Sequence, residues 1–143
     1  MKKINIFASL LILCTLTSCS LHIKDTNGKD NYSLNTITDE TILSSSGVIK
    51  SMAFQTTVNG SNVYKAKKFS GVEKIATYKN SFTLYVNNAV KSGNFRICLV
   101  CDNVIVKDFA INNSDSFTAL DSKVYDLYIA GESANFEMSY FTE

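Results

Sequence analysis

From Val48 to the end of the chain, apolar and polar residues alternate with a period close to two, and this alternation constrains the fold more than any other feature. The clearest stretch is 82–87, which reads Phe-Thr-Leu-Tyr-Val-Asn. Successive side chains of a strand point to opposite faces, so this order buries one face and leaves the other in water. No stretch of this part has a convincing helical period. The sequence therefore predicts the strands of an antiparallel sheet.

Turn signals separate the alternating stretches about every 8–12 residues. These signals are rich in Asn, Asp, Gly and Ser, and they fall at 59–62, 71, 79–80, 92–94, 102–103, 112–115, 121–123 and 131–133. Short strands at this spacing, in one domain over 47–143, are typical of a β-sandwich. We therefore predict an all-β fold, an antiparallel β-sandwich that is jelly-roll-like.

The beginning of the chain has a different character. Lys2 and Lys3 precede an apolar run over 6–16, which leads into Leu16-Thr17-Ser18-Cys19. The run has about 11 residues, whereas a membrane-spanning helix needs about 20 and the core of a signal peptide about 7–15. This order resembles the signal peptide and lipobox of bacterial lipoproteins.

The resemblance implies that the chain is exported and cut before Cys19, whose thiol then carries a diacylglyceryl group. Two or three acyl chains hold a protein stably on a bilayer. We accordingly expect a signal peptide over 1–18 and a lipid-anchored, extracytoplasmic protein on the cell membrane or the outer membrane. An ordinary secretory signal and an uncleaved anchor are the alternatives.

Residues 19–46 follow the expected cleavage site and are polar, with many Ser, Thr and Asn. This composition favours a flexible tether between the lipid and the domain. Apolar residues are scattered through it, among them Ile37, Ile42 and Leu43. Part of the segment is therefore a candidate for an additional early strand.

The charge is nearly balanced, at +1 for the whole chain, with 14 basic and 13 acidic residues. Loss of Lys2 and Lys3 with the signal peptide would leave 14 − 2 = 12 basic residues against 13 acidic ones. Such a chain lacks the electrostatic footprint of a nucleic-acid-binding protein and a polybasic membrane patch. The pair Lys67-Lys68 is interpreted as a solvated strand edge.

The chain contains one histidine, His22, and this residue falls in the predicted tether. Since no histidine falls in the domain, Ser-His and Cys-His nucleophile pairs and His-based zinc sites are disfavoured there. The loop 112–115 has oxygen ligands that suit part of a calcium site, although Asn and Asp are also ordinary turn residues. A catalytic pair of carboxylates is disfavoured in so small a domain. We therefore expect no enzyme, no cofactor and no metal.

Cys98 and Cys101 form a Cys-x-x-Cys pattern in a predicted strand. Residues three apart in a regular strand face opposite sides, so a disulfide requires Cys101 to have left the strand at the Asp102-Asn103 turn. The alternatives are a disulfide in an oxidising compartment and two reduced, buried thiols. Redox catalysis is disfavoured because thioredoxin-like proteins place this pattern at the start of a helix.

Two of the seven tyrosines are candidate ligand contacts. If the apolar residues around them point inward, Tyr85 and Tyr128 project outward from their strands. Outward rings could stack on sugar rings or dock a protein. The alternative is structural, because tyrosine is also common on the wet faces of ordinary sheets.

A second resemblance rests on three segments, 64–71, 90–97 and 124–131. Their spacing of strands and hairpin turns is similar to that of small sandwich lipoproteins of low-GC bacteria. It is more distantly similar to that of the jelly-roll-like pre-peptidase C-terminal domains of secreted enzymes. In that group a Gly before a Tyr usually opens the penultimate strand, whereas in this chain Lys123 and Val124 stand in its place. The resemblance implies a sandwich fold and an envelope location, and it implies no catalytic residues.

Together these features predict a lipid-anchored cell-envelope protein that acts as a non-catalytic binding or interaction module. Its expected partners are the membrane, through the lipid on Cys19, and an envelope protein or glycan. Nucleic acid is not expected. The alternative is a structural or accessory envelope lipoprotein without a small ligand, and a small hydrolase is the least favoured.

Overall fold

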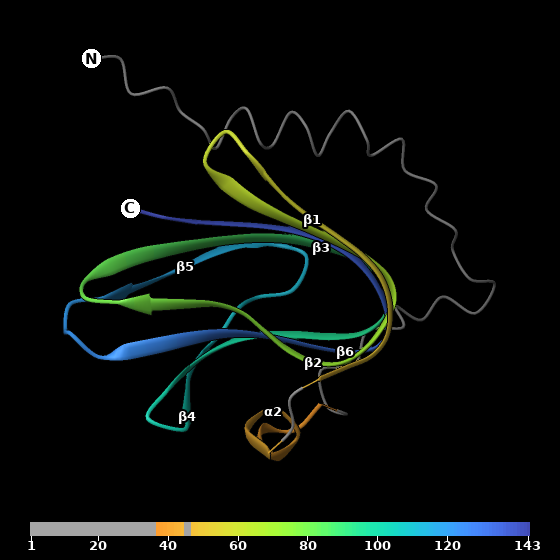
Figure 1. Ribbon diagram of the computed structural model, residues 1–143, viewed down its shortest axis with the longest axis horizontal. Helices are drawn as coiled ribbons and strands as arrows, with labels where there is room; N and C mark the ends of the chain where they lie inside the picture. Colours follow the sequence, from red (N-terminus) through yellow and green to blue (C-terminus); the bar gives the residue numbers. More distant parts are fainter. Residues whose placement is uncertain (1–36, 45–46) are drawn as a thin grey trace. The chain divides into compact units, whose positions relative to one another are not determined.

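The computed structural model describes residues 37–44 and 47–143, and these residues form an all-β fold with one short helix (Figure 1). Every strand pairing is antiparallel, in the order β1-β2-β6-β3-β4, with β5 also paired to β3. The predicted fold class is confirmed. The elements are α2 (Asp39–Ser44), β1 (Gly47–Val58), β2 (Ser61–Lys79), β3 (Phe82–Cys101), β4 (Val104–Asp108), β5 (Ser114–Ala119) and β6 (Val124–Thr142).

Three of the strands are far longer than the sequence suggested. β2 and β6 each have 19 residues and β3 has 20, and all three curve back at one side of the view in Figure 1. The signals at 71, 92–94 and 131–133 are bends within continuous strands and not turns between short ones, so that part of the prediction was wrong. One sheet therefore folds into two facing layers.

We call the two halves of the folded sheet the first and the second layer. In the first layer, β5 pairs with residues 82–87 of β3, whereas in the second layer β4 pairs with residues 98–101 of β3. The first layer comprises 52–58 of β1, 61–66 of β2, 82–90 of β3, β5 and 136–142 of β6, and the second comprises 72–79 of β2, 95–101 of β3, β4 and 124–130 of β6.

The bends lie at one level because the strand registers slip at the same place. β2 and β6 slip between Ala66 and Gly71, and β3 and β6 slip between Val90 and Asn94. Such bulges bend a strand and increase its local twist. Lys68 and Ser133, both in the bend, have positive φ angles of 52°.

Side chains replace part of the backbone hydrogen bonding across the bend. Asn135 of β6 accepts a hydrogen bond from the Lys68 backbone N–H (2.9 Å), and its amide nitrogen donates to the Ser92 hydroxyl. The Ser133 backbone N–H donates to the Ser70 hydroxyl (2.9 Å). These short polar side chains thus satisfy the N–H groups that the bulges release from the ladder.

Two glycines allow the chains to approach closely at the bend. Gly93 has a φ of 78°, and a Cβ atom there would lie 2.5 Å from the Ser133 carbonyl oxygen. At Gly131 the corresponding atom would lie 2.6 Å from the Phe69 ring. Only glycine fits such positions without moving its neighbours.

The main core lies between the two layers and follows the predicted inward faces. Leu84 and Leu127, from the first and the second layer, are completely buried in it. At the bend, Phe95 stacks on Phe136 with a centroid distance of 3.9 Å. At the opposite end, Phe82 contacts Tyr78, Phe117 and Tyr125. Aromatic rings therefore fill both ends of the core.

A smaller apolar cluster lies on the outer face of the second layer, under α2. Ile37 and Ile42 are buried there with Cys98. The Thr38 hydroxyl accepts a hydrogen bond from the Thr41 backbone N–H (3.2 Å), which is the geometry of a helix N-cap. Residues 37–44, which we assigned to the tether, thus pack on the sheet, and they do so as a helix and not as a strand. The signal peptide and Cys19 lie outside the described residues.

The bend can be tested with two glycine-to-alanine changes. Gly93→Ala and Gly60→Ala both place alanine at a positive φ, but only Gly93 has neighbours within contact distance of the added Cβ. We expect Gly60→Ala to reduce the free energy of unfolding by about 1–2 kcal/mol, the backbone cost alone. Gly93→Ala should cost clearly more, measured by urea denaturation. Equal losses would show that the close approach at Gly93 does not stabilise the bend.

Candidate functional site on the outer face of the first layer

Tyr85 lies on the outer face of the first layer, as the alternation predicted, and it pairs with a second ring. Phe141 of β6 is directly opposite Tyr85 of β3 in the sheet register, and the two rings stack with centroids 4.9 Å apart and planes 15° apart. The Tyr85 hydroxyl donates a hydrogen bond to the Glu143 carboxylate (3.3 Å). Partial burial and the negative charge of Glu143 raise the pKa of Tyr85, so its phenol stays neutral.

Small hydroxyl side chains surround the ring pair. Ser116 of β5 is opposite Tyr85 in the register, and the Thr83 and Thr118 hydroxyls are 3.1 Å apart. Hydroxyl groups both donate and accept hydrogen bonds and carry no charge. Beside the Glu143 carboxylate, this part of the face therefore offers neutral hydrogen-bonding groups to a polar ligand.

The same outer face carries exposed apolar side chains on β1. Phe54 is 60 % exposed and Val58 is 38 % exposed, and both share the outward side of their strand. Val58 lies in the same cross-strand row as the ring pair, with β2 between them, whereas Phe54 lies four residues further along β1, in the row of the Lys65–Glu137 ion pair. Scattered exposed apolar residues of this kind are normal on protein surfaces. The alternation from Val48 onward assigns Phe54 and Val58 to the buried face of their strand, and that expectation was wrong because both side chains are exposed. Phe141 had no signal because it is near the end of the given sequence.

The stacking of Tyr85 on Phe141 limits the ring surface that a ligand can contact. One face of Tyr85 is covered by Phe141, and one face of Phe141 is covered by Tyr85. Both residues are partly buried. The mutual stacking thus removes one face of each ring from contact with a ligand.

Tyr128, the second candidate ligand contact, lies elsewhere. It belongs to the second layer, on the outer face that α2 covers, and it packs against the cluster around Ile37 and Ile42. The structure therefore places Tyr85 and Tyr128 on opposite outer faces, and they cannot contact one small ligand together.

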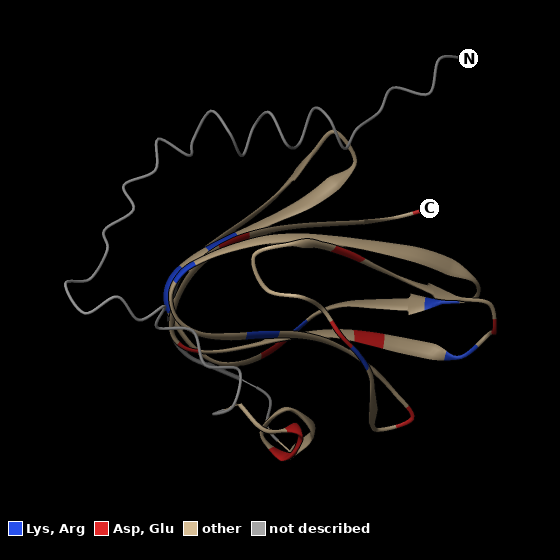
Figure 2. Cartoon of the chain, turned by 180° about the vertical axis from the view of Figure 1, so that it is seen from behind, with Lys and Arg blue, Asp and Glu red and all other residues tan. Residues whose placement is uncertain are grey.

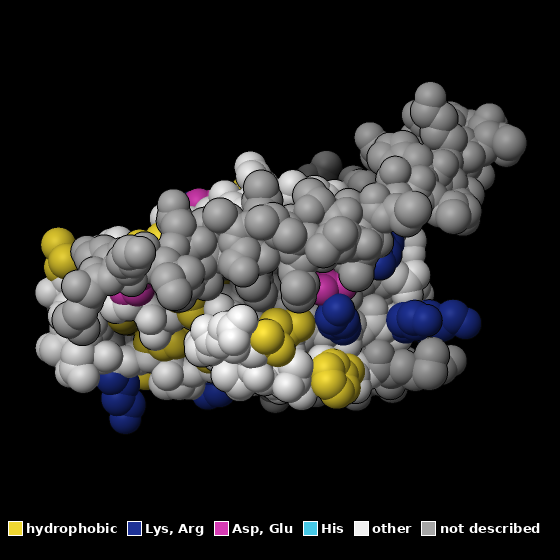
Figure 3. Space-filling view, turned by 90° about the horizontal axis from the view of Figure 1, so that it is seen from above, with side chains coloured by type: hydrophobic (Ala, Val, Ile, Leu, Met, Phe, Trp, Pro, Cys, Tyr) yellow, Lys and Arg dark blue, Asp and Glu magenta, His cyan; other side chains and the backbone are white. Residues whose placement is uncertain are grey.

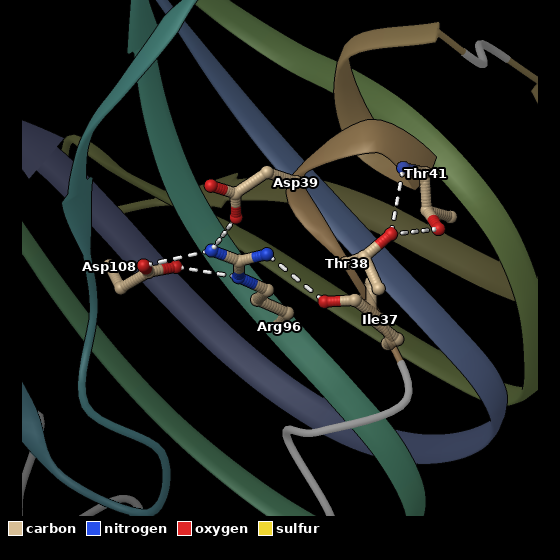
Figure 4. Close-up of polar contacts among 6 residues, drawn as sticks. All are labelled: Ile37, Thr38, Asp39, Thr41, Arg96 and Asp108. Carbon is tan, nitrogen blue, oxygen red and sulfur yellow. Dashed lines mark hydrogen bonds and ion pairs between the residues drawn. The ribbon is translucent and has the colours of Figure 1, made fainter.

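Arg96 holds α2 on that face (Figure 4). Its guanidinium donates two hydrogen bonds to Asp108 of β4 (2.7 and 2.9 Å), one to Asp39 of α2 (2.7 Å) and one to the Ile37 carbonyl (3.0 Å). The Arg96 side chain is 13 % exposed. Its hydrogen bonds to Asp108, the largest cause, and to Asp39 raise the pKa of the guanidinium above its usual value. A planar fork with fixed donors suits three acceptors at once.

No local sequence pattern indicates this arrangement. Arg96 is the only arginine in a chain with 14 basic residues, and that rarity is the one signal that could have drawn attention to it. Asp39 lay in the predicted tether, so no pattern connected it with Arg96 or Asp108.

Cys98 and Cys101 are both free thiols. Cys98 lies under α2 and Cys101 lies between the layers, so they occupy opposite sides of β3 and the geometry fits the reduced alternative. Burial raises the pKa of the Cys98 thiol to about 12. Such a thiol is unreactive while α2 covers it.

Glu73 is a partly buried carboxylate on the inward side of the second layer. It accepts a hydrogen bond of 2.5 Å from the Tyr64 hydroxyl, and burial, followed by this bond, raises the pKa of Tyr64. Nearby, the Gln55 amide donates to the Tyr140 hydroxyl (3.3 Å). A single carboxylate bound to a phenol fits a role in joining the layers, because general acid–base hydrolysis of sugars uses two carboxyl groups.

The loop 112–115, the candidate calcium loop, uses its polar groups within the chain. The Asn112 side-chain oxygen accepts from the Val90 backbone N–H (2.6 Å), and the Asp115 carboxylate binds Lys107 (2.8 Å) and the Ala110 backbone N–H (3.2 Å). Among the described residues there is no group of three or more His, Cys, Asp or Glu side chains that could hold a metal ion.

Comparison with known proteins adds no further information on the site. Neither the known protein families nor the curated proteins contain a match to this chain. In the part of the chain that the structure describes, no helix is long and apolar enough to span a membrane.

The role of Arg96 can be measured through Cys98. In a Cys101→Ser background, Arg96→Ala should increase the rate at which a thiol reagent modifies Cys98 several-fold, because α2 loses its hydrogen bonds to the sheet. Lys74→Ala is the matched control, since it removes an ion pair with Asp126 that does not involve α2. Equal rates in the two variants would show that Arg96 does not hold α2 in place.

Proposed function

We propose that the protein is a lipid-anchored, extracytoplasmic protein of the cell envelope that acts as a non-catalytic interaction module. The order of basic start, short apolar run and Leu16-Thr17-Ser18-Cys19 supports the anchor. The membrane is either the cell membrane or the outer membrane. The partner is an envelope protein or glycan.

The observation that carries the binding role is the outer face of the first layer. There the Tyr85–Phe141 pair and neutral hydroxyl groups share a sheet face with the exposed Phe54, which lies beyond the Lys65–Glu137 ion pair. Aromatic side chains beside neutral polar groups provide both contact area and hydrogen bonds, which are the elements of recognition at protein interfaces.

An accessory role without a small ligand is the second candidate. Two observations favour it: Tyr85 and Phe141 cover one face of each other, and Tyr128 packs under α2 instead of joining them. An enzymatic role has the least support, because the partly buried polar cluster around Tyr64 contains a single carboxylate, Glu73.

The anchor is tested by Cys19→Ala. Cells that express the wild-type protein or this variant are grown with radioactive palmitate, and the protein is then isolated. We expect label in the wild type and none in the variant, since Cys19 is the proposed acylated residue. Equal labelling of both proteins would refute the lipid anchor.

The binding face is tested by Tyr85→Ala and Phe54→Ala, with Tyr128→Ala as the control on the opposite face. Binding to purified cell-wall glycan and to envelope proteins is measured for each variant, and circular dichroism verifies the fold. Truncation of an aromatic anchor typically costs about 1–2 kcal/mol or more of binding energy. We therefore expect about 5- to 30-fold weaker binding for the first two variants and little change for Tyr128→Ala.

The same measurements separate the two roles. If the wild type binds neither class of envelope material, the accessory role is the better explanation. If the wild type binds and all three variants bind equally well, the outer face of the first layer is not the binding surface.

A further inference from the structure

The bend gathers lysines that are distant in sequence. Lys67 and Lys68 belong to β2 and Lys91 belongs to β3, and all three side chains are exposed. Ala66, which precedes Lys67, and Val90, which precedes Lys91, both pair with Phe136 of β6. Lys67 and Lys91 therefore flank β6 at the same level, two strand spacings apart, which is about 10 Å.

Lysines outnumber acids at the bend. Glu137 is paired with Lys65 (2.7 Å), and Glu132, which accepts a hydrogen bond from the neutral amide of Asn94, is the other acid there. Within 37–44 and 47–143, the side chains of Lys67, Lys68 and Lys91 take part in no ion pair.

The figures show the same concentration of charge. Blue stretches lie along the bend in Figure 2, and dark blue side chains project from the bend end of the molecule in Figure 3. The bend is thus basic although the chain as a whole is nearly neutral.

The chain also enters the domain at this end. Arg96, which binds the Ile37 carbonyl, is three residues from Gly93 in the bend, or about 10 Å along the strand. β1 begins with Gly47 opposite Val72, next to the bend. The C-terminus is at the other end, where Glu143 and Thr83 exchange backbone hydrogen bonds.

We propose that the bend docks on an anionic lipid surface, with Lys67, Lys68 and Lys91 facing the phosphate groups of the lipid heads. This inference rests on the proposed anchor at Cys19. Residues 20–36 separate Cys19 from Ile37, and a chain of that length reaches at most about 60 Å, so the domain stays within that distance of the bilayer.

The energetic scale fits an orienting contact. A lysine close to an anionic membrane surface strengthens binding about 5-fold. The attraction decays with distance from the surface over about one Debye length. Three lysines alone bind weakly, but an acyl anchor already places the domain at the surface. The lysines then select which end of the domain faces the lipid.

Amine labelling tests this orientation on the full lipidated protein. The protein is reconstituted into vesicles of pure phosphatidylcholine or of phosphatidylcholine with about a third phosphatidylglycerol, and lysine acetylation rates are measured by mass spectrometry. We expect Lys65, Lys67, Lys68 and Lys91 to react several-fold more slowly on the anionic vesicles at low salt. Lys79, at the opposite end, is exposed and should react equally on both.

A charge variant provides the control. Lys67→Gln, Lys68→Gln and Lys91→Gln are combined, and Lys65 is the reporter that remains beside them. The protection of Lys65 on anionic vesicles should be lost in this triple variant and retained in Lys79→Gln, with both folds verified by circular dichroism.

The outcomes separate the docking from the anchor. Protein that fails to associate with neutral vesicles would refute the lipid anchor. Protein that is anchored on both vesicles but shows equal labelling of the bend lysines would refute the docking alone, as would protection of Lys65 that survives in the triple variant.

Discussion

A row of backbone distortions that crosses the long strands at one level makes the rest of this structure possible. Lys68, Gly93 and Ser133 all have positive φ angles there, and the side chain of Asn135 supplies hydrogen bonds that the regular ladder loses. Without these bulges, strands of 19 or 20 residues would form one extended sheet with both faces in water. With them, the sheet closes on itself, and residues such as Leu84 and Leu127 become fully buried between the layers.

The second consequence of the bend is a new outer face, which α2 covers. A helix of six residues is too short to be stable alone, so packing and hydrogen bonds must hold it. Ile37 and Ile42 stand at the positions of a hydrophobic staple around the Thr38 cap, and Arg96 joins the helix to Asp108 at the sheet edge. The segment that leads toward the proposed anchor is therefore connected directly to the sheet.

The sequence predicted the strand faces of β2, β3 and β6 well, because burial on one side requires alternation whatever the topology. It failed in β1, where Phe54 and Val58 are exposed. It also placed the hairpin turns at Asn59-Gly60 and Asp102-Asn103, where the positive φ angles of the turn select for those residues. It failed at Gly93 and Ser133, because a turn and a bulge both require residues that tolerate positive φ. Only the register between distant strands distinguishes the two.

Other features were not predicted because they join residues that are far apart in the sequence. The helix α2 lay within a polar segment, and its signal, two isoleucines around a Thr cap, extends over only six residues. Lys67 and Lys91 are brought together by pairing with a third strand, β6, and no local pattern indicates this. The Tyr85–Phe141 pair likewise joins β3 with the last strand. Composition near neutrality therefore concealed a local excess of positive charge.

The basic bend and the Tyr85–Phe141 pair lie at different heights along the strands of the first layer, and this separation relates the two proposals. Tyr85 is six residues from Lys91 along β3, which is about 20 Å in an extended strand. If the lysines face lipid phosphates, the strands rise from the membrane and carry the ring pair well beyond the head groups. The opposite orientation would bring the carboxylate of Glu143 to the same phosphates, and their repulsion disfavours it. An anchor near the bend and a recognition surface near the far end are thus compatible in one small domain.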